Sequence, residues 1–253
     1  MPTWSAVQYL KFGDERTQPS RDLAGRIEVA QPLRVLDLGC GPGNSTAILG
    51  ERWPEAEITG LDNSSKMIEA ARAAYPQYYW LLSDIGSVGL EAWQQDFDVI
   101  FSNAALQWVP DHASLLPRLM QSLIPRGALA FQMPAYDSPA HRILRDLAAA
   151  RSLTVSTWHS HEPTFYYDVL SPCAARVDIW STEYLHVLDN QESIVDWYRG
   201  TGMRPYLDAL PAESDRERFT TEFLERLRPV YPPRSDGRIL FPFRRIFAIA
   251  YRQ

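Results

Sequence analysis

The stretch RVLDLGCGPGNSTAILG, residues 34–50, is the most informative part of this chain. A short apolar run, LRVLDL, is followed by Gly39, Gly41 and Gly43 and then by a helical pattern that begins at Asn44. A strand, a glycine-rich turn and a helix N-terminus form a cradle, because free backbone N–H groups and the helix dipole face the ligand there. The stretch therefore predicts that a nucleotide-like ligand approaches the backbone at the end of this strand.

Size and composition fit one large α/β domain. The chain has 253 residues, of which 45% are hydrophobic and 12% aromatic, and this is ample for a core. No apolar run approaches the ~20 residues that span a bilayer, and the N-terminus meets charged residues too early for a secretory signal. Cys40 and Cys173 show no C-x-x-C spacing, so we expect no disulfide framework, no metal site and a reducing cytoplasm.

The charge of the chain disfavours nucleic acid as a partner. The net charge is −6, so no overall positive field attracts a polyanion. Of the 25 basic residues only Lys11 and Lys66 are lysines. An arginine excess is the usual mark of a GC-rich genome, and it also supplies side chains that bind carboxylates with two parallel hydrogen bonds.

Strand and helix patterns alternate from residue 33 to about residue 133. The predicted strands are LRVLDL, EITGLD, YYWLLSD, FDVIFSN and ALAFQMP. The predicted helices between them are NSTAILGERW, SSKMIEAARAAY with Ser64 as N-cap, and DHASLLPRLMQSLIPRG, which stops at Pro125 and Gly127. This alternation predicts a Rossmann-like, doubly wound and mostly parallel sheet.

The pattern changes beyond residue 138. SPAHRILRDLAAAR predicts one more helix, residues 152–172 are aromatic and irregular, and ARVDIWSTEYLHVL predicts a long strand. Residues 190–230 are helical in pattern, and RRIFAIAYR closes the chain as a strand. We therefore expect a seven-stranded α/β sheet with a helical cap inserted between its two late strands.

Two carboxylates narrow the choice of ligand. Asp62 ends the second predicted strand, where an acid accepts hydrogen bonds from ribose hydroxyls. The NAD fingerprint is G-x-G-x-x-G, but here the third glycine comes one residue early and Asn44 takes the sixth place. Asp37 puts a carboxylate at the mouth of the cradle, where it would repel a pyrophosphate and attract an ammonium or sulfonium group. The pattern favours a cofactor with a positive centre over NAD.

The segments VLDLGCGPGNST, GLDNSSKMIEAAR, SDIGSV and DVIFSNAALQWVPD resemble the motif series of class I S-adenosylmethionine-dependent methyltransferases. Further segments, among them WSAVQYLKF, FQMPAYDSPAH, VDIWSTEYLH, IVDWYRGTGMRPYL and RRIFAIAYR, resemble the family that esterifies trans-aconitate, from about residue 4 to residue 251. The resemblance implies an O-methyltransferase that acts by direct in-line transfer from S-adenosylmethionine to a small polycarboxylic acid and releases S-adenosylhomocysteine.

The resemblance also implies how the chain is organised. It predicts a single domain over residues 1–253 with four parts: an N-terminal flap and helix (1–30), a cofactor-binding core (31–150), a late strand with a helical substrate cap (151–238), and a final strand (239–253).

Contacts with the cofactor follow from the resemblance position by position. Asp37 and the backbone around Gly39 would hold the methionine end, and Asp62 would bind both ribose hydroxyls. Asp84 would accept the adenine amino group, and Asn103 would offer its main-chain carbonyl to the ammonium group. The full implied set is Gln8, Tyr9, Asp37, Gly39, Cys40, Gly41, Asn44, Asp62, Asn63, Met67, Asp84, Ile85, Asn103, Ala104 and Trp108.

Plainer roles remain open for several of these residues. Trp4 and Tyr9, which with Gln8 resemble a flap over the methyl group, could be core aromatics instead. Asp84 could simply cap the turn that follows it, and Met67 could pack in an ordinary helix core.

A carboxylate substrate needs cations rather than a general base, because its pKa near ~4 leaves it ionised at neutral pH. No base is therefore assigned, and His112, His141, His159, His161 and His186 show no catalytic spacing. The substrate candidates are Arg16, Tyr166, Arg204 and Arg245, with Arg244, Tyr167 and Trp158 as further possible lining residues. The resemblance favours Arg204 and Arg245.

Other functions remain as alternatives. Another small-molecule or acyl carboxylate could be the substrate, and an NAD-dependent dehydrogenase or a non-catalytic cofactor-binding module would share the cradle. A nucleic-acid methyltransferase is disfavoured because NAALQW stands where an Asn/Asp-Pro-Pro-Tyr/Phe motif would follow the fourth strand. The expected partners are a small polycarboxylate, no nucleic acid and no membrane, with a monomer or alternatively a dimer.

Overall fold

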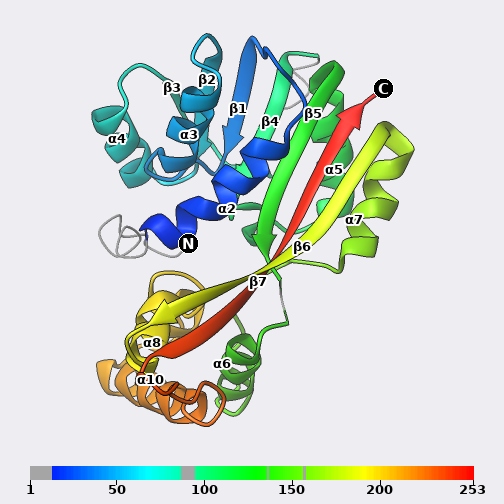
Figure 1. Cartoon of the computed structure of the whole chain (residues 1–253). Helices are drawn as coiled ribbons and strands as arrows, with labels where there is room; N and C mark the ends of the chain where they lie inside the picture. Colours follow the sequence, from blue (N-terminus) through cyan, green and yellow to red (C-terminus); the bar gives the residue numbers. More distant parts are fainter. Residues whose placement is uncertain (1–12, 87–94, 136, 156–157) are drawn as a thin grey trace. The chain divides into compact units, whose positions relative to one another are not determined.

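The computed structural model describes residues 13–86, 95–135, 137–155 and 158–253, with side chains from residue 17 onward (Figure 1). The strands are β1 (Arg34–Leu38), β2 (Glu57–Asp62), β3 (Tyr79–Leu82), β4 (Phe97–Asn103), β5 (Leu123–Pro134), β6 (Ala174–Leu188) and β7 (Ile239–Arg252). The α-helices are α2 (Gly13–Arg26), α3 (Asn44–Arg52), α4 (Ser65–Ala74), α5 (His112–Gln121), α6 (Pro139–Ala149), α7 (Pro163–Leu170), α8 (Gln191–Arg199), α9 (Arg204–Asp208) and α10 (Glu213–Leu227). Two short 3₁₀ turns are η2 (Leu106–Trp108) and η3 (Ser171–Cys173).

The seven strands form one sheet in the order β3-β2-β1-β4-β5-β7-β6. Strands β1 to β5 pair in parallel, and β7 pairs with β5 in the antiparallel direction. Helices α8, α9 and α10 lie between β6 and β7 in the chain. The predicted fold class is confirmed. The strand order reverses between β1 and β4, and ligands of open α/β sheets bind beside the carboxyl ends of the strands at such a point.

Two local predictions were wrong. The helix over residues 111–127 ends at Gln121, and β5 pairs with β4 from Leu123 onward. The register shifts before Ala128, so Pro125 and Gly127 lie in an irregular part of the strand instead of ending a helix. The stretch 152–172, predicted to be irregular, contains the helix α7, whose buried residues Tyr166 and Leu170 follow the spacing of four.

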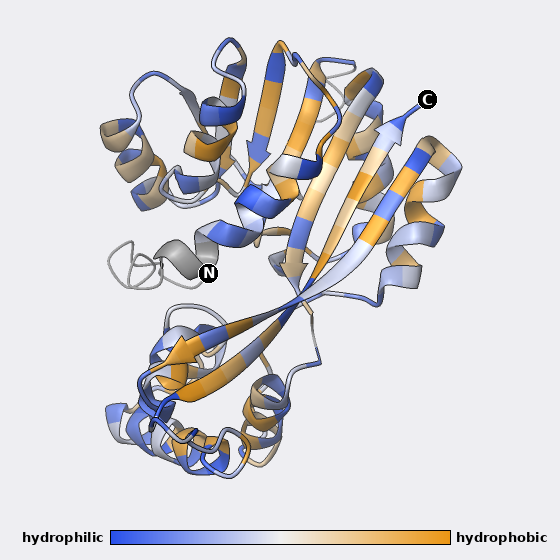
Figure 2. Ribbon diagram, viewed as in Figure 1, coloured by the Kyte–Doolittle hydropathy of each residue, from blue (hydrophilic) through white to orange (hydrophobic). Residues whose placement is uncertain are grey.

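The chain folds into two compact units, which we name the sheet unit and the helical unit. In the described part of the chain, the sheet unit comprises residues 13–134, 159–182 and 245–253. Its core is formed by the apolar strands β4 and β5, with α2 on one face of the sheet and α5 on the other (Figures 1 and 2). Apolar residues on both faces of a parallel strand are expected where helices cover both faces.

The helical unit comprises residues 135–158 and 183–244 and contains α6, α8, α9 and α10. Its core is aromatic: the ring centroids of Tyr198 and Phe223 lie 5.7 Å apart, and those of Trp197 and Phe241 lie 5.9 Å apart. All four side chains are fully buried. Among the helices of the described segments, none is both long and apolar enough to cross a membrane.

Candidate functional site

The carboxyl ends of the parallel strands bring the predicted cofactor residues to one edge of the sheet unit. Leu38 of β1 pairs with Leu61 of β2, and Asn103 of β4 pairs with Gln132 of β5. Asp62, the last residue of β2, pairs with Leu82 of β3. The edge therefore collects the glycine turn and the polar residues at the tips of β2, β4 and β5. We use the name cofactor edge for the glycine turn (residues 39–43) together with Asp62, Asn103 and Gln132.

The glycine turn packs closely against neighbouring residues at one of its glycines and leaves space at another. Gly39 has φ +72°, and a Cβ atom there would collide with the Cβ of Ala105. Gly41 has φ +55°, but no atom lies within 4 Å of the position that its Cβ would take. The N–H groups of Gly39 and Cys40 both donate to Leu61 O, at 2.7 and 2.9 Å. The turn is thus fixed to β2, with open space beside Gly41.

Asp37 lies beneath the cradle, not at its mouth as the sequence had suggested. Its side chain is fully buried, and its Oδ2 accepts hydrogen bonds from Ser45 Oγ at 2.6 Å and Thr46 Oγ1 at 2.7 Å. Its Oδ1 is buried and has no hydrogen-bond partner among the described residues. Burial raises the pKa of Asp37 to about 6, although the two hydroxyls oppose this shift. The carboxylate ties the first turn of α3 to β1.

Asp62 is held by backbone N–H groups of the glycine turn and of the start of α4. Its Oδ2 accepts from Gly41 N and its Oδ1 from Ser64 N, both at 2.9 Å. Burial raises its pKa, while these hydrogen bonds lower it. A carboxylate has about four acceptor sites, so capacity remains for another donor such as a hydroxyl of a ribose.

The structure brings Asn63 and Asp84 together. Asn63 Nδ2 donates to Asp84 Oδ2 at 3.2 Å, and Gly86 N donates to Asp84 Oδ1 at 2.9 Å. Asp84 therefore does cap the turn after β3 with one carboxylate oxygen, while its other oxygen accepts from Asn63. Met67 and Ile85 are both buried and supply apolar surface from α4 and from the β3 loop.

At the tip of β4 the structure contains residues that the sequence interpretation missed. Gln132 Nε2 donates to Asn103 Oδ1, and Gln132 O accepts from the backbone N–H of Ala104 at 3.0 Å. Ala104 has φ +55°, and its carbonyl accepts from Gln107 Nε2 at 2.7 Å. The carbonyl of Ala104 is thus already engaged, while Trp108 lies in the short turn η2. A buried glutamine inside the apolar run ALAFQMP was the signal that could have identified Gln132.

Among the substrate candidates, Arg245 lies at this same edge. It is 3% exposed, and its Nη1 donates to Gln132 Oε1 at 3.1 Å. Arg244, the preceding residue, has an exposed side chain. Strand alternation explains this difference, because successive residues of β7 point to opposite faces.

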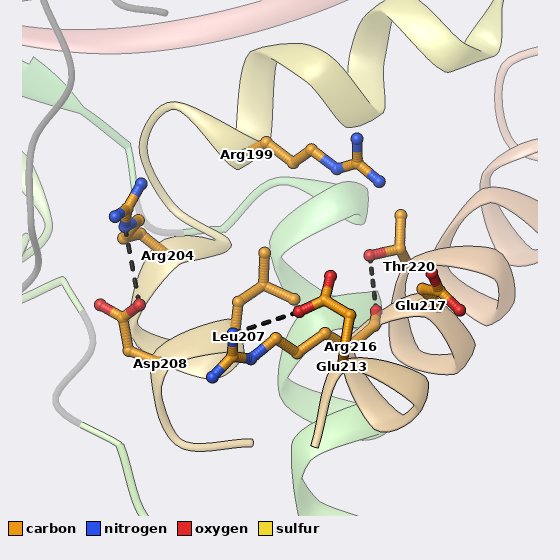
Figure 3. Close-up of a pocket in the computed structure, with 8 residues that line it drawn as sticks. All are labelled: Arg199, Arg204, Leu207, Asp208, Glu213, Arg216, Glu217 and Thr220. Carbon is orange, nitrogen blue, oxygen red and sulfur yellow. Dashed lines mark hydrogen bonds and ion pairs between the residues drawn. The ribbon is translucent and has the colours of Figure 1, made fainter. Parts of the chain in front are cut away.

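Arg204 belongs to the helical unit and lines a pocket there of about 450 Å³ (Figure 3). The residues that line it are Arg199, Arg204, Leu207, Asp208, Glu213, Arg216, Glu217 and Thr220. Arg204 Nε lies 3.6 Å from Asp208 Oδ1, and Arg216 Nη1 lies 3.3 Å from Glu213 Oε2. We call this cavity the arginine pocket. Two of its three arginines are thus already in ion pairs.

Tyr166 is placed in the packed interior of the sheet unit. Its hydroxyl accepts from His161 N at 3.0 Å and donates to Met133 Sδ at 3.2 Å, and its Oη lies 3.1 Å from His112 Nδ1. Trp158 is buried in the helical unit, where its ring centroid lies 3.9 Å from that of His141. Both residues contribute to a core, whereas Tyr167 is exposed. Trp4, Gln8, Tyr9 and the side chain of Arg16 lie outside the described residues.

Comparisons with known proteins indicate the family of the chain. A family model described as a methyltransferase domain matches residues 36–131. A trans-aconitate 2-methyltransferase of Azoarcus sp. (strain BH72) is 47% identical, with all of both chains covered. One of Methylobacterium nodulans is also 47% identical, with 100% of this chain and 99% of the relative covered.

Solved structures resemble the chain in fold. The YcgJ protein of Bacillus subtilis gives a TM-score of 0.64 at 16% identity, covering 93% of this chain and 99% of that one. Phosphoethanolamine N-methyltransferase 2 of Haemonchus contortus, solved with S-adenosyl-L-methionine, gives 0.59 at 15% identity, covering 98% and 56%. At these identities the likeness concerns the fold.

Proposed function

The chain belongs to the trans-aconitate 2-methyltransferase family, and from this premise we propose that it transfers a methyl group from S-adenosylmethionine to a carboxylate of trans-aconitate. The observation that carries the proposal is that the 47% sequence identity to these methyltransferases extends over the full length of the chain. It covers the whole chain, and therefore the helical unit as well as the glycine turn that methyltransferases of many substrates would share.

The cofactor edge fits S-adenosylmethionine in three respects. Open space beside Gly41 admits a ligand close to the backbone. Asp62 retains acceptor capacity for the ribose hydroxyls of the cofactor. The unpartnered Oδ1 of Asp37 leaves negative charge uncompensated under the cradle, which favours a cationic ligand over a pyrophosphate. When bound, S-adenosylmethionine supplies a methyl group that its sulfonium centre has already activated.

The residues of the chain then position two reactants and exclude water. Asp62 binds the ribose, and the glycine turn, fixed to β2, accommodates the methionine end close to the backbone. Arg245 binds a carboxylate of the substrate, because a buried guanidinium pairs well with a planar anion. The attacking carboxylate oxygen is ionised at neutral pH and needs no base. Most of the rate enhancement is expected from this positioning.

Several finer expectations belong to the same proposal. We expect a monomer, or alternatively a dimer, in the cytoplasm, and the free thiols of Cys40 and Cys173 support a reducing compartment. The division into a flap (1–30), a core (31–150), a late strand with cap (151–238) and a final strand (239–253) stays a prediction. We expect no nucleic acid or membrane partner.

The test is transfer of a labelled methyl group from S-adenosylmethionine to a panel of acids. The panel contains trans-aconitate, cis-aconitate, citrate and a saturated dicarboxylate. We expect trans-aconitate to give the highest kcat/KM. A methyl ester is hydrolysed by mild base, whereas an N-methyl or C-methyl product is stable, so release of labelled methanol identifies the bond that forms.

Each other outcome changes the conclusion. Preference for a different acid would keep the reaction and replace the substrate. A base-stable product would overturn carboxyl methylation. Binding of NAD in place of S-adenosylhomocysteine in calorimetry would overturn the assignment of the cofactor edge.

A further inference from the structure

Gln132 connects the two sides of the proposed reaction. Its side chain is completely buried at the end of β5, and it bonds at both ends: Nε2 donates to Asn103 Oδ1, and Oε1 accepts from Arg245 Nη1 at 3.1 Å. Asn103 lies at the cofactor edge, and Arg245 is the buried substrate candidate.

The sheet register places these three side chains on one face. Asn103 of β4 is the direct partner of Gln132 in the parallel pair. Phe247 of β7 is the partner of Gln132 in the antiparallel pair, so Arg245, two residues earlier, is its diagonal neighbour. Both contacts thus follow from backbone pairing rather than from flexible loops.

The chemistry of Arg245 sets the direction of every hydrogen bond in this chain of contacts. A guanidinium can only donate, so the amide of Gln132 must turn its oxygen towards Arg245. The NH₂ group of Gln132 then faces Asn103, which must present Oδ1 to it. The NH₂ group of Asn103 is consequently turned away from Gln132, and within the described segments it has no hydrogen-bond acceptor.

We propose that Gln132 is a positioning residue that fixes the guanidinium of Arg245 for the substrate carboxylate and turns the amide NH₂ of Asn103 towards the cofactor. The inference rests on the proposed function. According to this proposal, the buried amide of Gln132 influences the affinity for both cosubstrates through Asn103 and Arg245, and does so without contacting either cosubstrate itself. Asn103 would then act as a hydrogen-bond donor to the carboxylate of the methionine moiety, in addition to the main-chain role predicted for it.

The test is a set of double-mutant cycles read on the two KM values separately. Asn103→Ala should raise KM for S-adenosylmethionine about tenfold and leave KM for trans-aconitate within twofold. Arg245→Met should raise KM for trans-aconitate about 30-fold or more and leave KM for S-adenosylmethionine within twofold. Gln132→Met, which keeps the length of the side chain and removes both hydrogen bonds, should raise both KM values at least fivefold.

Non-additivity separates positioning from general destabilisation. Adding Gln132→Met to Asn103→Ala should raise KM for S-adenosylmethionine by less than twofold further, because Gln132 acts there through Asn103. Adding it to Arg245→Met should likewise leave KM for trans-aconitate nearly unchanged. A further variant, Gln132→Glu, adds a negative charge, and its control is Gln121→Glu, which adds the same charge at an exposed residue at the end of α5.

Gln132→Glu provides a second line of evidence should Gln132→Met fold poorly. The glutamate keeps the contact with Arg245 but neutralises its charge, and it has no NH₂ for Asn103. We expect both KM values to rise at least fivefold, and Gln121→Glu to change neither. Either a KM within twofold of wild type or fully additive effects would overturn the inference while leaving methylation of trans-aconitate in place. Absence of trans-aconitate methylation by the wild type would instead overturn the proposed function.

Discussion

The cofactor edge and the arginine pocket are constructed in different ways. At the edge, backbone groups of the glycine turn are fixed to β2, and Asp62 is held by backbone N–H groups. In the pocket, arginines project from helices, and Arg204 and Arg216 pair with exposed carboxylates. Groups that the backbone already holds in place can bind a ligand without reorganising. Exposed ion pairs contribute little free energy, and their partners are easily exchanged. We therefore expect substitutions at the edge to have the larger and more specific effects.

The largest effect is expected from Asp62→Ala. Hydrogen bonds to a charged group contribute about 1.5–3 kcal/mol each, so loss of two ribose contacts should weaken S-adenosylmethionine binding by about 100-fold or more. The measurement is the Kd of S-adenosylhomocysteine by calorimetry.

Asp98→Ala is a matched control for this variant. Asp98 Oδ2 also accepts from two backbone N–H groups, those of Leu33 at 3.0 Å and Arg34 at 2.8 Å, but at the opposite ends of the strands. Its loss should lower the unfolding temperature and leave the Kd unchanged. Equal weakening of binding in both variants would mean that the effect of Asp62 is structural.

Arg245→Met should give the next largest effect, this time on the acid. Removing one partner of a buried charged pair costs about 2–5 kcal/mol, so KM for trans-aconitate should rise about 30-fold or more. Arg204→Met should raise it by less than about tenfold, because Arg204 is 28% exposed and already pairs with Asp208. Steady-state kinetics at saturating S-adenosylmethionine measures both. Unchanged KM values in both variants would discard both arginines as substrate ligands.

The fold could be predicted because its signals are local. Each of β1 to β4 is a short apolar run next to turn residues, and the glycine turn needs backbone angles such as the φ of +72° at Gly39. The end of α5 could not be predicted from Pro125 and Gly127, because both residues are equally compatible with a bulge. Only the pairing of β5 with β4 shows that these residues belong to an irregular part of a strand and not to the end of a helix.

The candidate site divides in the same way. Asp62 and the glycines could be nominated from the sequence because the chemistry of a cradle fixes their order along the chain, and their roles stay predictions. Gln132 and Arg245 are 113 residues apart in sequence, and no local pattern places them in contact. The burial of Asp37 was missed for a similar reason, since a carboxylate next to glycines gives no indication that Ser45 and Thr46 will cover it.

Asp37 predicts a pH dependence of cofactor binding. Because burial raises the pKa of Asp37 to about 6, ionisation of this group lowers the free energy of unfolding. This loss of stability is absent below pH 3.8, grows between pH 3.8 and 6, and is complete above pH 6. A cationic ligand favours the ionised form, so affinity should rise with pH through about 6. We expect S-adenosylhomocysteine, which keeps the ammonium group, to bind up to about tenfold more weakly at pH 5 than at pH 7.5.

Asp37→Asn should remove the part of this dependence that is centred near pH 6. Any remaining slope would belong to Asp62, whose pKa is also raised by burial and which interacts electrostatically with Asp37. Calorimetry at pH 5, 6 and 7.5 gives the three Kd values. An identical slope in wild type and variant would exclude Asp37 as the titrating group.

The smallest effect is expected from an ion pair of the helical unit. Arg151 Nη2 lies 2.7 Å from Glu222 Oε1, and the guanidinium lies 5.3 Å from the ring centroid of Phe219. Both partners are partly shielded, so Arg151→Ala should cost about 1 kcal/mol and lower the unfolding temperature by about 2–4 °C. Arg142→Ala removes a pair with Asp137 in which both side chains are about half exposed, and should lower it by less than 1 °C. Because both arginines belong to the helical unit and the cofactor edge belongs to the sheet unit, the Kd of S-adenosylhomocysteine should stay within twofold in both variants. A larger change in Kd would mean that the helical unit contributes to cofactor binding, and the contrast between the two regions would then no longer hold.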